Sequence, residues 1–117
     1  MGPFRAGCLA LALAAGSAAA CEVPGDGTSL RRALLKVKYL AETEAWERAA
    51  RRTSTVQYVL SLDAPLEREG RCYWPVEAKS AGATWQTFYA TPRGEHILVA
   101  VPGGEPLPLE EWRARAR

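Results

Sequence analysis

The chain has 117 residues, of which 15 are basic and 13 acidic, so its formal net charge is +2. This near-neutral balance argues against nucleic acid as the main partner, because phosphate binding requires a concentrated basic surface. The length suits one domain with one hydrophobic core. After residue 20 there is no second apolar segment long enough to span a membrane.

The first 20 residues have the pattern of an export signal. Arg5 supplies the positive start, and Cys8–Ala15 is an apolar run too short for a permanent membrane helix. Ala18–Ala20 forms a small-residue cleavage site. We therefore predict a signal peptide over residues 1–20 and a mature protein that begins at Cys21 and is periplasmic or secreted.

Two interpretations of Cys21 remain open. In an oxidising compartment it would form a disulfide with Cys72, the only other cysteine after the signal. Closing a loop of about fifty residues would stabilise the fold by about 3–4 kcal/mol in the chain-entropy model. Alternatively, small residues directly before a cysteine resemble the bacterial lipoprotein motif, and Cys21 would then carry a membrane anchor. That motif usually has Leu where Ala18 stands, and lipidation would leave Cys72 unpaired.

One long amphipathic helix is predicted over about residues 29–52. Its apolar stripe, widened on one side by Tyr39 and Trp46, has helical spacing. The stripe comprises Leu30, Ala33, Leu34, Val37, Leu40, Ala41 and Ala45. Arg31 and Arg32 lie at the helix end where the dipole disfavours cations. With the preceding residues they could hold an anion, although no phosphate-loop pattern is present.

After the helix the hydrophobic period changes to two, which predicts four strands. The strands cover residues 55–62, 71–79, 84–91 and 96–101. Pro75 cannot donate a ladder hydrogen bond and therefore favours an edge strand or a bulge. We expect an α+β domain over residues 21–102, in which the long N-terminal helix packs on a four-stranded antiparallel meander as a two-layer sandwich.

The last segment, residues 103–117, has a different composition. Proline and glycine at its start predict a linker, and arginines at its end predict a short basic tail. A short helical piece could run from Leu109 through Trp112. The segment is then either a solvated terminus or a place where Trp112 and the arginines dock on an acidic partner or a lipid surface.

The run from Tyr73 to Leu98 resembles the strand and turn core of PepSY-type domains, which are small exported bacterial modules. The matching features are Tyr73, Val76, Gly82, Phe88–Tyr89, Gly94 and Ile97–Leu98. The chain departs from that family at Ala90 and Thr91, where an acidic residue usually stands. The resemblance covers about half of the mature chain and implies the fold more than a function.

The element order is also similar to the cystatin-like arrangement, in which a meander wraps around one helix. Residues 57–61 echo the protease-binding Gln-x-Val-x-Gly loop of cystatins. Here Gln57 lies inside a predicted strand and Ser61 replaces the final glycine. This resemblance would imply an inhibitory module.

The sequence contains no recognisable catalytic set. His96 is the only histidine, and no zinc-type ligand spacing surrounds it. No motif marks a nucleophilic serine or cysteine. We therefore predict no catalytic residue, no metal site and no cofactor.

The large aromatic residues are the main functional indication. One face of the sheet must cover the helix, so Tyr73 and Phe88 could stand on the other face and mark a partner surface. We predict binding residues Tyr73, Phe88, Trp85 and Trp112 in a non-enzymatic module that binds or inhibits another envelope protein. The alternative is a small enzyme or small-ligand carrier with a pocket between helix and sheet.

Overall fold

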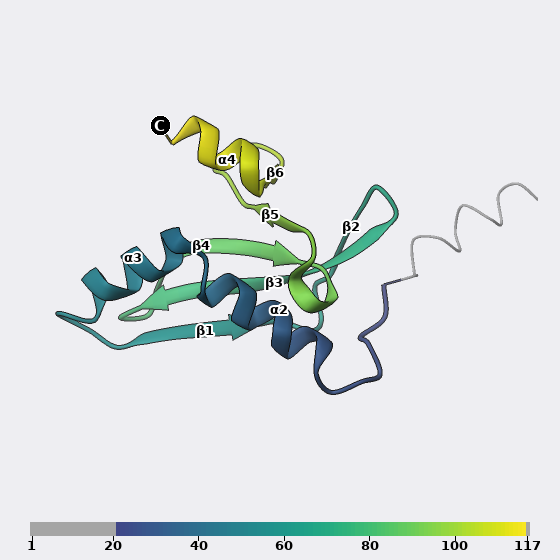
Figure 1. Cartoon of the computed structure of the whole chain (residues 1–117), viewed down its shortest axis with the longest axis horizontal. Coiled ribbons are helices and arrows are strands. Elements are labelled where there is room, and N and C mark those ends of the chain that lie inside the picture. Colours follow the sequence, from purple (N-terminus) through teal and green to yellow (C-terminus); the bar gives the residue numbers. More distant parts are fainter. Residues whose placement is uncertain (1–20, 117) are drawn as a thin grey trace, which may run out of the picture.

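The structure, a computed structural model, describes residues 21–116 (Figure 1). The predicted export signal lies outside this range. Within it the chain forms helices α2 (Ser29–Lys38), α3 (Ala41–Ala50) and α4 (Leu109–Arg115) and a 3-10 helix, η1 (Pro92–Gly94). Its strands are β1 (Val56–Leu60), β2 (Leu66–Arg68), β3 (Arg71–Ser80), β4 (Ala83–Ala90), β5 (Ile97–Val99) and β6 (Leu107–Pro108). None of the helices described is long and apolar enough to cross a membrane.

The strands form an antiparallel sheet in the order β1-β3-β4-β5-β6, and β2 pairs with β3 as a separate arm. The α+β class and the antiparallel pairing agree with the prediction, but the four-stranded meander is wrong because β2 and β6 add to it. Pro75 lies between the parts of β3 that pair with β1 and with β2. Its carbonyl accepts a hydrogen bond from the Ser61 amide at 3.1 Å, and its missing N–H ends the β1 ladder there.

The predicted single long helix is also wrong, because the chain leaves the helix at Tyr39 and Leu40. Leu40 has extended backbone angles (φ −64°, ψ 143°) and a buried side chain. A straight helix over residues 29–52 would be about 36 Å long. The ten residues of β3, the longest strand, span about 33 Å, and the eight residues of β4 span about 26 Å. The break therefore lets α2 and α3 both lie on the sheet (Figure 1).

The core lies between these helices and one sheet face. Ala33 and Val37 of α2 pack with Leu40 against residues of β3, β4 and β5. The sheet contributes Val76, Phe88, Ala90 and Val99. Phe88 pairs with Val76 across the sheet, so both side chains point to the same face and toward the helices.

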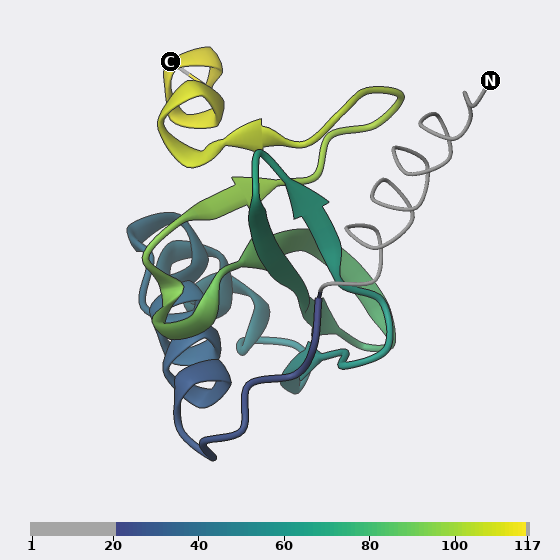
Figure 2. The same ribbon diagram turned by 90° about the vertical axis from the view of Figure 1, so that its right-hand side faces the viewer.

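This placement corrects the predicted aromatic surface. Phe88 is 0% exposed and Tyr73 is 3% exposed, so neither can contact a partner. Tyr73 does point away from the face that Trp74 occupies. Tyr73 pairs with Leu66 of β2, and Arg68 of β2 forms an ion pair at 3.3 Å with Glu105 in the loop before β6 (Figure 2 shows both segments).

Trp85 is turned into the molecule by a bulge. The register between β3 and β4 shifts at Ala78 and Lys79, which leaves Trp85 as the extra residue of β4. Its ring stacks on Trp46 of α3 with centroids 4.8 Å apart. It also lies 6.1 Å from Phe88, so it joins α3 to the core.

The C-terminal segment is part of the domain, which corrects the predicted division at residue 102. Strand β6 pairs with β5, and α4 follows it directly. Trp112 of α4 meets Phe88 edge to face with centroids 5.9 Å apart. Arg113 donates two hydrogen bonds to the Glu42 carboxylate of α3, at 2.7 and 3.0 Å.

A disulfide joins Cys21 to Cys72 of β3, with the two α-carbons 5.5 Å apart. It connects the start of the described chain to the sheet across 51 residues of sequence. Such a bond indicates an oxidising location outside the cytoplasm. Because one sulfur cannot carry both a disulfide and a thioether-linked lipid, the two interpretations of Cys21 exclude each other.

Intact-mass measurement of the exported protein separates them. We expect the mass of the chain that begins at Cys21, reduced by two hydrogens and without any acyl group. Reduction should then restore two hydrogens and lower the free energy of unfolding by about 3–4 kcal/mol. A diacylglyceryl or triacyl addition on Cys21 would contradict this expectation.

The core position of Phe88 gives a second prediction. Phe88→Ser should lower the free energy of unfolding by about 3–5 kcal/mol, since it leaves a cavity and buries a hydroxyl group. Tyr39→Ser, at an exposed position, should change it by no more than about 0.5 kcal/mol. Urea unfolding followed by circular dichroism measures both. Equal stabilities of the two variants would show that Phe88 is not in the core.

Candidate functional site

The structure does not bring the predicted binding residues together on a surface. Tyr73 and Phe88 are buried, while Trp85 and Trp112 are half-buried and pack against the core. His96 is exposed at the turn before β5. Among residues 21–116 no group of three potential metal ligands is found.

A different surface has the charge and shape of a binding site. Helix α2 contains Arg31, Arg32, Lys36 and Lys38 but no acidic residue. Tyr39, where α2 ends, is the most exposed large hydrophobic residue described, at 61%. We call the surrounding area the Tyr39 surface; it consists of Arg32, Leu35, Lys36, Lys38, Tyr39, Glu44, Glu47, Arg48, Arg51 and Arg93.

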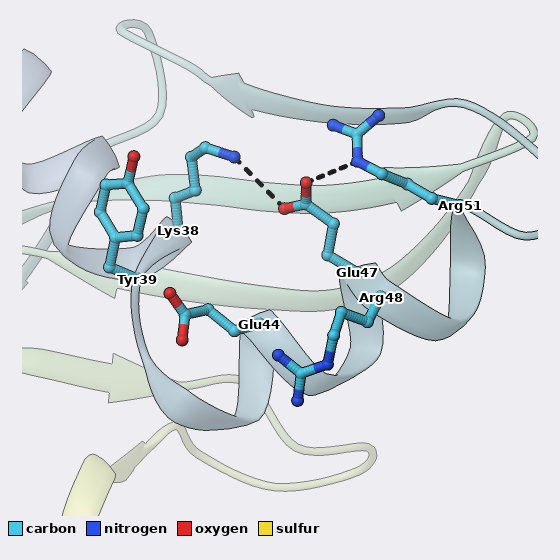
Figure 3. Close-up of a pocket in the computed structure, with 6 residues that line it drawn as sticks. All are labelled: Lys38, Tyr39, Glu44, Glu47, Arg48 and Arg51. Carbon is cyan, nitrogen blue, oxygen red and sulfur yellow. Dashed lines mark hydrogen bonds and ion pairs between the residues drawn. The ribbon is translucent and has the colours of Figure 1, made fainter.

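Tyr39 stands between two hollows of this surface. One, of about 480 Å³, is lined by Arg32, Leu35, Lys36, Tyr39 and Arg93. The other, of about 260 Å³, lies between the end of α2 and helix α3 (Figure 3). It is lined by Lys38, Tyr39, Glu44, Glu47, Arg48 and Arg51. The Tyr39 ring is therefore a ridge between the two hollows, of which the larger has three cations and the smaller has three cations and two carboxylates.

The Glu47 carboxylate binds three side chains in and beside the smaller hollow. Lys38 from α2 and Arg51 from the end of α3 point toward its carboxylate, at 3.3 and 2.6 Å (Figure 3). The Tyr58 hydroxyl of β1 donates a further hydrogen bond to it. Glu47 thus joins α2, α3 and β1 and neutralises part of the positive charge around it.

These contacts shift two pKa values in opposite directions. The Tyr58 hydrogen bond, followed by those from Arg51 and Lys38, lowers the pKa of Glu47 from 4.5 to about 2. Burial and the adjacent Glu47 carboxylate raise the pKa of Tyr58. Glu47 is therefore a carboxylate and Tyr58 a neutral donor over the physiological range, and neither is poised to transfer a proton near pH 7.

The larger hollow retains its positive charge. Arg32 and Lys36 form no ion pair with any acidic side chain among residues 21–116. Arg93 forms one with Glu95, but the pair is exposed and its N–O distance is 3.4 Å. Exposed pairs of this kind contribute little. The hollow thus presents three guanidinium or ammonium groups beside the apolar surface of Leu35 and Tyr39.

Close packing of η1 on α2 fixes the position of Arg93. Gly94 has a positive φ of +69°, and a Cβ there would lie 2.7 Å from the Lys36 Cβ. Only glycine fits this approach. Arg93 also has a positive φ, 65°, which is unfavourable for an arginine and is imposed by the surrounding structure.

The start of α2 is not an additional anion site. The Asp26 carboxylate accepts hydrogen bonds from the Ser29 amide at 2.9 Å and from the Thr28 amide at 3.2 Å. A hydrogen bond from the Ser29 hydroxyl, followed by these amide bonds, lowers the pKa of Asp26. The chain's own carboxylate therefore binds two of the amides at this helix end.

The sequence carried one indication of this surface. Arg31 and Arg32 lie at the helix end where cations are unfavourable for helix stability, so another role would explain them. Tyr39 was expected to widen the apolar stripe, but the helix break turns it to solvent. The sequence did not predict the hydrogen bond between Glu47 and Tyr58, because this contact depends on the packing of α3 against β1.

Comparison with known protein families, curated proteins and solved structures finds no match to this chain. Function must therefore be inferred from the chain's own residues.

The lowered pKa of Glu47 predicts a pH dependence of stability. A depressed carboxyl pKa stabilises the fold above the unfolded value of 4.5, and this stabilisation is lost as pH falls toward 2. Glu47→Gln should lower the free energy of unfolding at pH 7 by about 1–3 kcal/mol. The difference between wild type and variant should shrink as pH falls from 4.5 to 2. Urea unfolding at several pH values measures this, and a constant difference would contradict the role of Glu47.

Proposed function

We propose that this protein is an exported, non-enzymatic binding module that holds an acidic segment of another envelope protein against the Tyr39 surface. One observation carries the proposal: α2 has four cations and no acidic residue, and it ends at Tyr39, a residue that is 61% exposed. Exposed aromatic and arginine side chains are the residues most often found at the centre of protein interfaces.

The shape of the surface favours a protein over a membrane. Hollows of about 480 and 260 Å³ flank Tyr39 and are large enough to receive side chains of a partner. A lipid surface would instead favour a continuous apolar face with cations around it. Here only Leu35 and Tyr39 are apolar, and the acidic Glu44 lies in the same area.

The compartment agrees with this role. The disulfide supports export, and we propose that the mature protein is periplasmic or secreted as the disulfide-bonded form. A lipidated Cys21 is the alternative and would hold the protein at a membrane. The mass measurement described above separates the two forms.

A carrier of small ligands is less well supported. Side chains of Val37, Leu40, Val76 and Phe88 fill the space between α2 and the sheet, where such a pocket was expected. The hollows on the Tyr39 surface are open to solvent, and the pKa of Glu47 in the smaller one is lowered to about 2. They suit side chains of a protein better than an enclosed small molecule.

In-cell photo-crosslinking tests the proposal. A photoreactive amino acid replaces Tyr39 in the exported protein, and in a control it replaces the exposed Glu67 of β2. We expect Tyr39 to capture a defined protein with an acidic segment, and Glu67 to capture none of it. Purified partner should then bind the wild-type protein less tightly as salt concentration rises.

Charge reversal provides the matched comparison. The double variant Arg32→Glu/Lys36→Glu should weaken binding about tenfold or more, because each reversal replaces attraction by repulsion. Arg71→Glu/Arg115→Glu makes the same change in net charge elsewhere and should leave binding nearly unchanged. Equal losses in both variants would show a nonspecific charge effect. Capture of lipid at Tyr39, together with binding to anionic vesicles, would show that the Tyr39 surface binds a membrane and not a protein.

A further inference from the structure

Strand β1 is an edge strand that lacks the features by which edge strands usually avoid pairing with another chain. It pairs with β3 on one side, and no described strand pairs with its other side. Natural proteins commonly protect such edges with charged side chains, proline or a bulge. Residues 55–62 (TVQYVLSL) contain no charge and no proline, and the bulge of this sheet lies between β3 and β4.

The hydrogen-bond pattern shows which backbone groups of β1 are open. Ser61 donates to Pro75 of β3, and antiparallel ladders bond every second residue. Gln57 and Val59 therefore bond to β3. The N–H and C=O groups of the alternate residues, Val56, Tyr58 and Leu60, point outward from the sheet.

We propose that β1 is a self-pairing edge at which two copies of this chain join their sheets. An antiparallel arrangement with Tyr58 of each copy at the two-fold axis places Val56 opposite Leu60 of the other copy. All three outward-facing residues then form ladder hydrogen bonds. A shift of the register by one residue would place them opposite inward-facing residues and would lose these bonds. The side chains of Gln57 and Val59 become cross-strand neighbours.

The charges and apolar residues near β1 favour a second copy over an unrelated strand. Arg52 precedes β1 and Asp63 follows it, and neither forms an ion pair among the residues described. Antiparallel pairing brings the basic end of one strand to the acidic end of the other. Val59 and Leu62, 38% and 51% exposed, lie on the same stretch and would lose contact with water.

Two substitutions and a matched control test this proposal in the disulfide-bonded protein. Val59→Lys places one charge at the pairing edge of each copy, so that a dimer would contain two. Val56→Pro removes an outward N–H that makes no bond to β3, at the first position of the strand, where proline is tolerated. Thr84→Lys makes a similar change at an exposed position on β4. Circular dichroism verifies that each variant is folded.

Sedimentation equilibrium over a wide concentration range measures self-association. We expect the wild type and Thr84→Lys to form dimers, and the other two variants to dissociate at least about tenfold more readily. Amide exchange by NMR adds a specific readout. The amides of Tyr58 and Leu60 should be protected only at high concentration, whereas those of Gln57 and Val59 should be protected at every concentration.

Three outcomes would overturn the proposal. The wild type could remain a monomer at every concentration. This outcome includes the case in which β1 pairs with a strand of another protein and not with a second copy. Dimers could persist unchanged in Val59→Lys and Val56→Pro, which would place the interface elsewhere. Dimers could also form without any change in exchange at Tyr58 and Leu60, which would exclude pairing through the backbone.

Discussion

The extended backbone at Leu40 is the constraint on which the rest of the molecule depends. It turns the Leu40 side chain into the core and the Tyr39 ring to solvent, in consecutive residues. It also directs α3 back over the sheet, where Trp46 stacks on Trp85. Without this break, the apolar residues that follow Leu40 would extend beyond the sheet, and the cations of α2 would not border α3.

Several side-chain contacts hold the break in place. Lys38 before it and Arg51 after it both meet Glu47, which also accepts the Tyr58 hydrogen bond. Arg113 of α4 holds Glu42 in the first turn of α3. The C-terminal segment therefore supports the same region from the other side. This explains why residues after 102 belong to the domain.

The sequence predicted the local elements better than their arrangement. Hydrophobic periods located a helical region and strands near β1, β3, β4 and β5, because those signals depend on neighbouring residues. No proline or glycine marks the break at Tyr39, and the contacts that Leu40 and Trp46 make there are with residues far along the chain. Strands β2 and β6 have three and two residues, too short for a periodic pattern.

The candidate site was missed for a related reason. Alternation could not give the register of β4, and the observed pairing of Phe88 with Val76 places Phe88 inside. The predicted pairing of Cys21 with Cys72 depended only on counting cysteines, and it is present. Cations on α2 were visible in the sequence, but the lack of an ion pair at Arg32 and Lys36 within the described residues is a property of the folded surface.

This small disulfide-bonded domain has two outward features of different chemistry. The Tyr39 surface offers fixed cations and an aromatic ridge, which suit an acidic protein segment. The β1 edge offers unpaired backbone groups, which suit a second copy. A dimer would present two Tyr39 surfaces and could bind a partner with repeated acidic segments more tightly than one surface does.

The most direct test of the central claim is NMR mapping of the bound partner on this protein. Titration of the captured partner into the labelled protein should shift the amides of Arg32, Leu35, Lys36 and Tyr39 most strongly. Amides of β2 and of the outer sheet face should remain unchanged. Shifts confined to the sheet, with residues 32–39 unaffected, would contradict the assignment of the Tyr39 surface as the contact site.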